Sequence, residues 1–120
     1  MKSPGADHPI RVAPARRRVT VALDGVTIAE SDAALELKEA RYPPVYYFPR
    51  GDVRMDLLAP SGYATHCPYK GCARHFHVHA AGRIVGDAVW SYETPYPALA
   101  EIAMRLAFYP DRVAITVHDG

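Results

Sequence analysis

Cysteine, long apolar runs and phosphate-binding motifs are scarce or absent in this sequence. Two of the 120 residues are cysteine, too few for the disulfide scaffold of a small secreted domain, so free or metal-bound thiols are expected. No apolar run reaches the roughly 20 residues that span a bilayer. The segment after Arg16–Arg18 is interrupted by Asp24 and Glu30, and is therefore unlike a secretory signal. These absences predict a cytoplasmic protein without a membrane partner.

The size and charge of the chain indicate one domain with a basic N-terminal segment. A hydrophobic content of 49% and a charged content of 22% are ordinary for a globular protein, and a chain of this length forms one core rather than two. The net charge is +1, yet residues 1–18 carry five basic side chains against one acidic. We interpret residues 1–17 as a flexible, solvated tail that is not expected to bind nucleic acid, and residues 18–120 as a single domain.

Alternating apolar residues and turn motifs predict antiparallel strands. Residues 19–23 and 26–29 alternate on either side of Asp24-Gly25, a dipeptide that favours a two-residue hairpin turn. Leu35 and Leu37 have the spacing of a strand. Further strands are expected over residues 45–48, 74–79, 84–85 and 87–92, with a turn at Ala81-Gly82.

One helix and a final hairpin are predicted near the C-terminus. Pro97 suits a first helical turn and favours a helix from there to about Arg105, and a short helical turn is expected over residues 53–58. Residues 106–109 and 113–117 flank Pro110-Asp111, which favours a turn, so we expect these segments to pair with each other. The predicted fold class is therefore mainly antiparallel β, with a short helix in the C-terminal half.

Four blocks of the sequence, in the same order, resemble the domain-of-unknown-function family 427 (DUF427). The blocks are Tyr46–Arg50 with Asp52-Val53, Thr65–Gly71, Ala88–Tyr92 with Pro95, and Ala107–Pro110 with Arg112-Val113. The resemblance extends from about Arg18 to His118. It implies a β-tent, in which two antiparallel sheets meet at an angle. The family also carries a nucleotidyltransferase label, which would imply an enzyme of that class.

The residues themselves give little support to nucleotidyl transfer. That reaction uses paired carboxylates to hold metal ions, and a backbone cradle to hold phosphates. Neither Gly-x-Gly-x-x-Gly nor Gly-Lys-Ser/Thr occurs in the chain. Asp52 and Asp56 are separated by three residues within a predicted helical turn, where capping by Asp52 and solvation of Asp56 are the alternative interpretation. The residues therefore favour other functions over this one.

Both cysteines and four of the six histidines lie within residues 65–79. Cys67 and Cys72 are separated by four residues, more than in the Cys-x-x-Cys pairs that bind structural zinc. His75, His77 and His79 alternate on a predicted strand and share one face, but its ends are about 13 Å apart, so one ion could bind two of them at most. Cys67, Cys72, His75 and His77 are the candidate zinc ligands. The alternative is that the two cysteines are metal-free thiols and that the histidines form a polar face of the sheet. No cofactor is predicted.

The turn Pro68-Tyr69-Lys70-Gly71 can present backbone N–H groups beside an ammonium group, an arrangement that suits a carboxylate or a phosphate. A thiol beside such a charge can be reactive, so Cys67 and Lys70 are the candidate catalytic residues. The alternative for both residues is an ordinary turn exposed to solvent, without a catalytic role.

Aromatic side chains with polar tips, held between two angled sheets, favour a small-ligand pocket. The predicted ligand-binding residues are Tyr47, Arg50, Cys67, Lys70, Trp90 and Tyr92.

Three functions follow from these patterns. The first is a domain that binds a small anionic or aromatic ligand in an aromatic pocket between the sheets. The second is an enzyme, either nucleotidyl-transferring as the family label implies or thiol-dependent through Cys67 and Lys70. The third is an interaction module stabilised by a metal ion. Exposed edge strands would also allow a homodimer.

Overall fold

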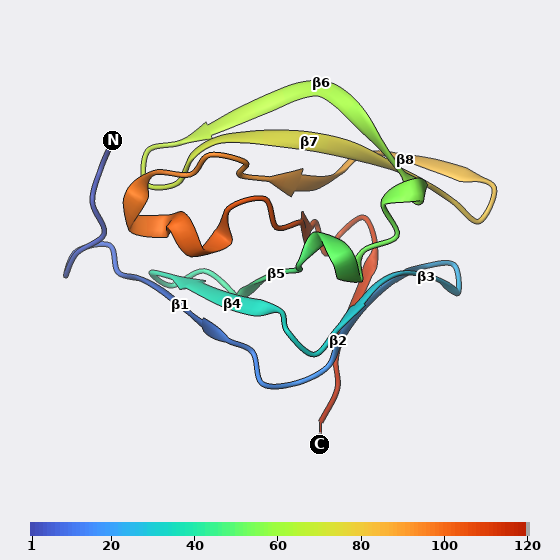
Figure 1. The fold of residues 1–120 in the computed structure, drawn as a ribbon, viewed down its shortest axis with the longest axis horizontal. Helices are drawn as coiled ribbons and strands as arrows, with labels where there is room; N and C mark the ends of the chain where they lie inside the picture. Colours follow the sequence, from blue (N-terminus) through green and yellow to red (C-terminus); the bar gives the residue numbers. More distant parts are fainter. Residues whose placement is uncertain (120) are drawn as a thin grey trace.

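The computed structural model describes residues 1–119, which form ten strands and three short 3₁₀ segments (Figure 1). In chain order these are β1 (Ile10–Pro14), β2 (Val19–Leu23), β3 (Val26–Ser31), β4 (Leu35–Glu39), β5 (Val45–Tyr47), η1 (Arg50–Asp52), η2 (Met55–Leu57), β6 (Leu58–Cys67), β7 (Gly71–Ala80), β8 (Arg83–Ser91), η3 (Pro97–Ile102), β9 (Ala107–Phe108) and β10 (Ala114–Val117). No helix among the described residues has the length and apolar character needed to cross a bilayer.

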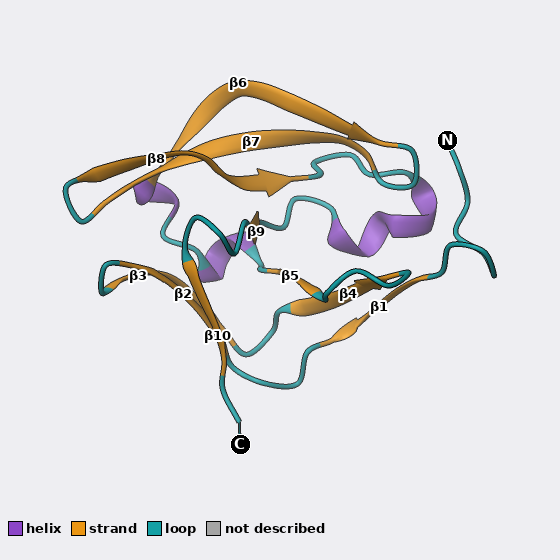
Figure 2. Cartoon of the chain, turned by 180° about the vertical axis from the view of Figure 1, so that it is seen from behind, coloured by secondary structure: helices purple, strands orange, loops and turns teal. Residues whose placement is uncertain are grey.

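The strands form three antiparallel sheets arranged in two layers. One layer is the four-stranded sheet β6-β7-β8-β9; the three-stranded sheets β1-β4-β5 and β10-β2-β3 lie opposite it, as both views show (Figures 1 and 2). The predicted mainly β, antiparallel fold is confirmed. The layer expected to be one sheet is instead two, because β10 extends the β2-β3 hairpin while β5 extends β4.

Two of the predicted turns are confirmed, and each reverses the chain through positive φ angles. Asp24 and Gly25 have φ of 48° and 84° and join β2 to β3. Ala81 and Gly82, with φ of 54° and 70°, join β7 to β8. Two successive residues with positive φ match the right-handed twist of the flanking strands, and this explains why both hairpins close with two residues.

The expected C-terminal hairpin is wrong. Ala107 and Phe108 form β9, which pairs with β8, whereas β10 pairs with β2 along Ala114↔Ala22 to Val117↔Val19. Alternation identifies a strand but not its partner, and here β9 pairs with β8, where Ala107 and Phe108 are both buried, instead of pairing across the local turn. The two segments flanking Pro110-Asp111 therefore belong to different sheets.

The predicted helix is present as a shorter 3₁₀ segment, η3. Its buried residues Leu99 and Ile102 are three positions apart, which places them on one side of a 3₁₀ helix. Leu99 departs from helical geometry and Ala103 is already extended, so the segment ends before Arg105. This segment lies between the two layers, near the end of the β6–β7 hairpin (Figure 1).

Part of the expected N-terminal tail is a strand. Residues 10–14 form β1, paired with β4 from Ile10↔Glu39 to Pro14↔Leu35. Ile10 and Val12 pack against the interior, because alternate residues of an edge strand face the same side. The ordered fold therefore begins before the boundary at residue 18.

The interior contains two apolar clusters. The first core is built mainly from the β2–β3 hairpin and the facing half of β7–β8 and includes Val19, Val21, Ile28, Phe48, Phe76, Val78, Val89, Leu106 and Phe108. The second core comprises Leu37, Tyr47, Ala73, Tyr92, Leu99, Ile102 and Ala107, with Cys67 and Trp90 packed against it. It is the second core that borders the predicted site.

Candidate functional site

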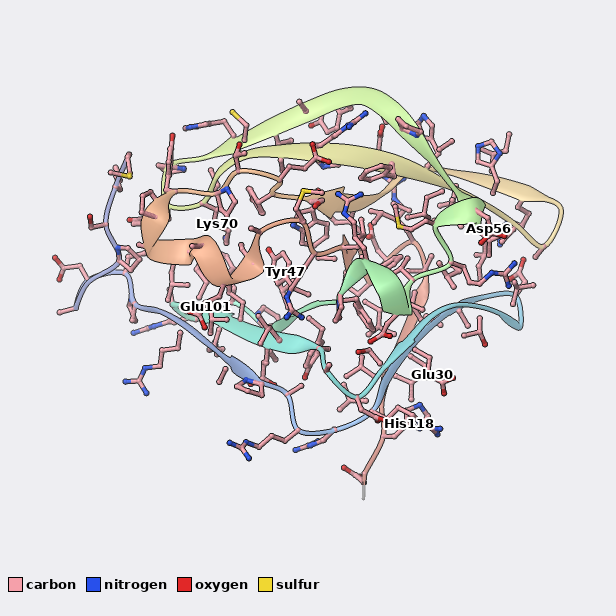
Figure 3. The ribbon with its side chains drawn as sticks, viewed as in Figure 1. Glu30, Tyr47, Asp56, Lys70, Glu101 and His118 are labelled. Carbon is pink, nitrogen blue, oxygen red and sulfur yellow. The ribbon has the colours of Figure 1, made fainter. Side chains whose placement is uncertain are left out.

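Lys70 points into the protein from the turn between β6 and β7. Cys67 pairs with Gly71 at the end of the hairpin, so Lys70 lies in a tight loop. Gly71 has φ of 111°, a conformation that strains any residue with a Cβ, and it allows the chain to reverse directly after Lys70. The Tyr96 N–H donates to the Lys70 carbonyl at 2.9 Å and fixes the loop against the segment before η3. Figure 3 shows Lys70 at this end of the molecule and Tyr47 between the layers.

The Lys70 ammonium is held by a carboxylate from the opposite layer. Its Nζ donates to Glu39 Oε1 and lies 3.8 Å from Cys67 Sγ. His8 Nε2 lies 2.8 Å from the other Glu39 oxygen, and its ring stacks on Tyr69 with 4.1 Å between centroids. Burial disfavours the charged form of Glu39, but hydrogen bonds from Lys70 and His8 outweigh this and hold the Glu39 pKa below its ordinary value. Glu39 is therefore ionised at neutral pH.

Tyr47, Trp90 and Tyr109 form an aromatic row beside this pair. The Trp90 indole N–H donates to the Tyr47 hydroxyl at 3.2 Å, and the two rings meet edge to face. Tyr109 lies on the other side of Trp90, with 4.4 Å between ring centroids. Burial raises the pKa of both Tyr47 and Tyr92 well above the ordinary value. Both phenols consequently remain neutral hydrogen-bonding groups at physiological pH.

Arg50 is not part of this cluster. Its guanidinium donates to the Met104 carbonyl at 2.6 Å and to Glu93 at 3.1 Å, and it lies over the Phe76 ring. It also donates to Ser91 at 3.3 Å, and Ser91 faces the side of β8 opposite to Trp90 because neighbouring strand residues alternate. Of the six predicted ligand-binding residues, five gather around the second core and Arg50 lies apart.

An apolar groove of about 640 Å³ opens between β5 and β10, the edges of two different sheets. Among the predicted residues, Trp90 lines it directly, and Glu39, the partner of Lys70, is also a lining residue. The lining is Glu39, Tyr42, Pro43, Pro44, Val45, Tyr46, Trp90, Phe108, Pro110, Ile115 and Val117. Most of these were not expected from sequence. The sequence Tyr42-Pro43-Pro44, whose tyrosine is exposed in the structure, is a local signal that could have indicated this surface.

The candidate zinc ligands are dispersed. His66 and Cys72 are direct cross-strand partners and share the exposed face, so Cys67 faces the interior on the opposite side. His75 is fully buried against Tyr109, while His77 Nδ1 accepts the Asp87 N–H at 3.0 Å. Within residues 1–119, no three His, Cys, Asp or Glu side chains are grouped in a way that could hold one metal ion.

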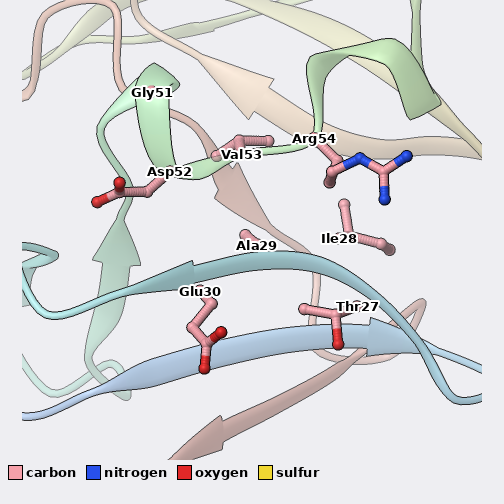
Figure 4. Close-up of a pocket in the computed structure, with 8 residues that line it drawn as sticks. All are labelled: Thr27, Ile28, Ala29, Glu30, Gly51, Asp52, Val53 and Arg54. Carbon is pink, nitrogen blue, oxygen red and sulfur yellow. The ribbon is translucent and has the colours of Figure 1, made fainter.

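The acidic pair considered for nucleotidyl transfer is already engaged by neighbouring side chains. Asp52 accepts from the Ser31 hydroxyl at 2.6 Å, and Asp56 accepts a bidentate pair of bonds from Arg54. Asp52 lines a second hollow of about 370 Å³, between β3 and the η1–η2 segment (Figure 4). In that view the Glu30 carboxylate and the Arg54 guanidinium lie apart, and Asp52 points to one side. The lining of this hollow includes two carboxylates, Asp52 and Glu30, together with the Arg54 guanidinium, and Asp52 is already hydrogen-bonded to Ser31.

Comparison with family models identifies the family of this chain. A family model described as "Domain of unknown function (DUF427)" matches residues 11–119. The match includes most of β1 and, of the cluster around Lys70, Glu39, Cys67, Tyr69 and Lys70; His8 lies before its start. A search of curated proteins finds no match to this chain.

Proposed function

The chain belongs to the DUF427 family, and we propose that it binds a small, flat, aromatic ligand in the groove between β5 and β10. The ligand would lie against Trp90 and Phe108 and would donate a hydrogen bond to Glu39. The observation that carries the proposal is a groove whose lining is almost entirely apolar and aromatic, with one acidic residue, the ionised Glu39, among the lining residues.

The size and lining of the groove support this ligand class. A volume of about 640 Å³ lies within the range of small-molecule sites, roughly 300–1,000 Å³. Four aromatic side chains and three prolines line it, and these rigid surfaces bind flat apolar molecules with little loss of conformational entropy. In a pocket with few polar groups, one or two hydrogen bonds typically orient the ligand.

Glu39 favours a ligand with a donor group. A carboxylate has about four acceptor sites, and Lys70 and His8 use two of them. An anionic ligand would instead need a free cation, yet Lys70 is paired with Glu39 and Arg50 with Glu93. Between the two ligand classes expected from sequence, the contacts favour the aromatic one.

The proposal is tested by a thermal-shift and calorimetric screen of small aromatic compounds, each supplied as an amine and as the matching carboxylate. We expect hits among the amines. Val117→Trp, which narrows the groove from a half-buried edge position, should abolish binding, and Glu39→Gln should weaken it about tenfold. Ile84→Ala, at an exposed position outside the groove lining, is the matched control. Amine hits that bind Val117→Trp as well as wild type would contradict the assignment.

A second candidate function rests on one contact, the 3.8 Å between Lys70 Nζ and Cys67 Sγ. A thiol close to an ammonium group can act as a nucleophile. In a Cys72→Ser background, where Cys67 is the remaining thiol, we expect rapid alkylation by iodoacetamide that slows in Lys70→Met. Equal alkylation rates in the two proteins would contradict the hypothesis of a thiol-dependent enzyme.

Incubation with ATP or GTP and Mg²⁺ tests the nucleotidyltransferase label of the family. Metal analysis of the untagged protein tests the hypothesis of a metal-stabilised interaction module.

A further inference from the structure

We propose that a second site, distinct from the groove, binds a small organic cation such as an alkylated ammonium group. It is a pocket of about 370 Å³ lined by Tyr63, His75, Asp87, Tyr109, Asp111 and Arg112. These residues come from β6, β7 and β8 and from the loop after β9. The groove and this pocket share no lining residue, so the inference is independent of the proposed function.

Two irregularities of the sheet bring the pocket residues together. The β6–β7 register shifts between Pro60 and Ala64, and this places Tyr63 over the His75 ring. The β7–β8 register shifts between Phe76 and Val78, so that Asp87 lies in an extra stretch of β8. Bulges of this kind redirect side chains and occur often beside binding sites. Two bulges at the same level of one sheet therefore mark this position as a built site.

The aromatic rings provide the surface that a cation prefers. Tyr63 and His75 have ring centroids 4.8 Å apart at 64°, and Tyr109 lies nearly parallel to His75 at 6.0 Å. A hydrogen bond of 3.1 Å between His75 Nε2 and the Tyr109 hydroxyl fixes the two rings. Organic cations bind to aromatic faces within about 6 Å of a ring centroid, and alkylated ammonium groups are recognised by cages of such rings.

Asp87 supplies a carboxylate, and hydrogen bonds to both its side chain and its backbone hold this residue in place. The Ser61 hydroxyl donates to its Oδ1, and its backbone N–H donates to His77 Nδ1 at 3.0 Å. Its φ of 49° lies in the left-handed region, which Asp tolerates better than most residues. The carboxylate is thus pre-positioned beside the rings rather than free to rotate into solvent.

The charge balance of the pocket favours a cation over an anion. The lining has two carboxylates, Asp87 and Asp111, against the single guanidinium of Arg112, which lies 3.9 Å from Asp111 and donates to the Gly86 carbonyl, so the charge of Asp87 remains in excess. Burial lowers the pKa of His75, so its ring is neutral at physiological pH and does not repel a cation. A metal ion is a poorer candidate, because the residues in the described chain offer no group of three suitable ligands.

His75 lies at the base of the pocket. Its side chain is completely buried against Tyr63 and Tyr109, so its own ring offers no free face to a ligand. The neutral ring adds no positive charge to the pocket. The aromatic surface open to a cation is therefore that of Tyr63, which is exposed, and of Tyr109, which is half-buried.

The test is an NMR titration of the full chain with tetramethylammonium chloride, at constant ionic strength maintained with NaCl. We expect saturable shifts confined to Tyr63, Asp87, Tyr109 and their neighbours. Tert-butanol, a neutral molecule of similar shape, should bind at least tenfold more weakly. Tyr63→Ala removes an exposed ring without disturbing the core, and Asp87→Asn keeps a residue that tolerates the left-handed backbone.

Each of these two variants should weaken binding at least fivefold, whereas Tyr42→Ala, an exposed tyrosine in the groove, should not change it. The spectra of the free variants establish that each is folded. Shifts that do not saturate, equal binding of tert-butanol, or wild-type affinity in both Tyr63→Ala and Asp87→Asn would each overturn the proposal.

Discussion

Lys70 differs from the other lysines and arginines of residues 1–119 because it is buried. A buried ammonium is tolerated when a carboxylate and further hydrogen bonds replace the water it has lost. Glu39 supplies that carboxylate from β4, 31 positions away in sequence, and His8 holds the other carboxylate oxygen. One ion pair thus ties the β6–β7 turn to the opposite layer, and it also holds the carboxylate of Glu39, a residue that lines the groove.

Breaking this pair from one side should be costly. Lys70→Met leaves Glu39 without its buried counter-ion, and we expect the free energy of unfolding to fall by about 3–5 kcal/mol. The double variant Lys70→Met/Glu39→Gln leaves no uncompensated charge and should recover a large part of that loss. Urea unfolding monitored by circular dichroism measures all three proteins. If the double variant were as unstable as Lys70→Met, the pair would not be the source of the loss.

His75 should make stability depend on pH. Its pKa in the folded protein lies below the ordinary value of 6.5 because burial disfavours the charged ring. As pH falls below 6.5 the unfolded chain binds a proton that the folded chain does not, so stability is lost, by up to about 1.4 kcal/mol per pH unit. His75→Gln removes this site. Denaturant unfolding between pH 7.5 and 5 should therefore show a steeper loss in wild type than in the variant, and parallel curves would contradict the assignment.

At the level of secondary-structure elements, the hairpins owe their register to their turns. The β2–β3 and β7–β8 hairpins each close through two residues with positive φ. Such turns impose one pairing, and one pairing decides which residues face the core. The bulges in β6–β7 and β7–β8 then depart from that alternation at the positions that build the cation pocket.

The β2–β3 turn provides a direct measurement of this dependence. Gly25 has φ of 84°, where a side chain is strained although nothing lies within 4 Å of an added Cβ. Gly25→Ala should therefore lower the free energy of unfolding by about 1–2 kcal/mol. Gly51→Ala, whose Cβ also meets no atom within 4 Å and whose φ is not in the left-handed region, is the control and should be neutral or slightly stabilising. Thermal unfolding measures both variants, and an equal change in the free energy of unfolding for Gly25→Ala and Gly51→Ala would contradict this explanation.

At the scale of the whole molecule, the groove exists because three sheets meet rather than two. Its walls are the edge of β5 and the edge of β10, which belong to separate sheets, and its inner wall is Trp90 and Phe108 from the opposite layer. The N-terminal segment contributes to the same region, since β1 extends the β4-β5 sheet and His8 holds Glu39.

Truncation should separate the strand from the residues before it. Removing residues 1–14 deletes β1, with its half-buried Ile10 and Val12, and we expect a loss of about 2 kcal/mol from the apolar burial alone. Removing residues 1–7 keeps both β1 and His8 and should change the midpoint of thermal unfolding much less. A flexible tail over residues 1–17 would instead predict that both truncations leave the midpoint unchanged.

Sequence by itself determined the features that depend on neighbouring residues. Alternation identified most strands, Asp24-Gly25 and Ala81-Gly82 identified two hairpins, and the blocks around Tyr47, Lys70 and Trp90 identified the family. These predictions succeed because backbone preference and side-chain alternation act over only a few neighbouring residues, so the local sequence determines them.

Tertiary structure alone decided which distant segments meet. It paired β10 with β2, turned Arg50 towards Glu93, set Glu39 against Lys70, and assembled the groove and the cation pocket from residues far apart in the chain. The physical reason is that the free energy gained by burying apolar surface does not depend on direction. Many different pairings of the same strands would therefore bury apolar surface equally well. The pairings that occur are the ones that let the whole chain close its cores while each buried charge keeps a partner.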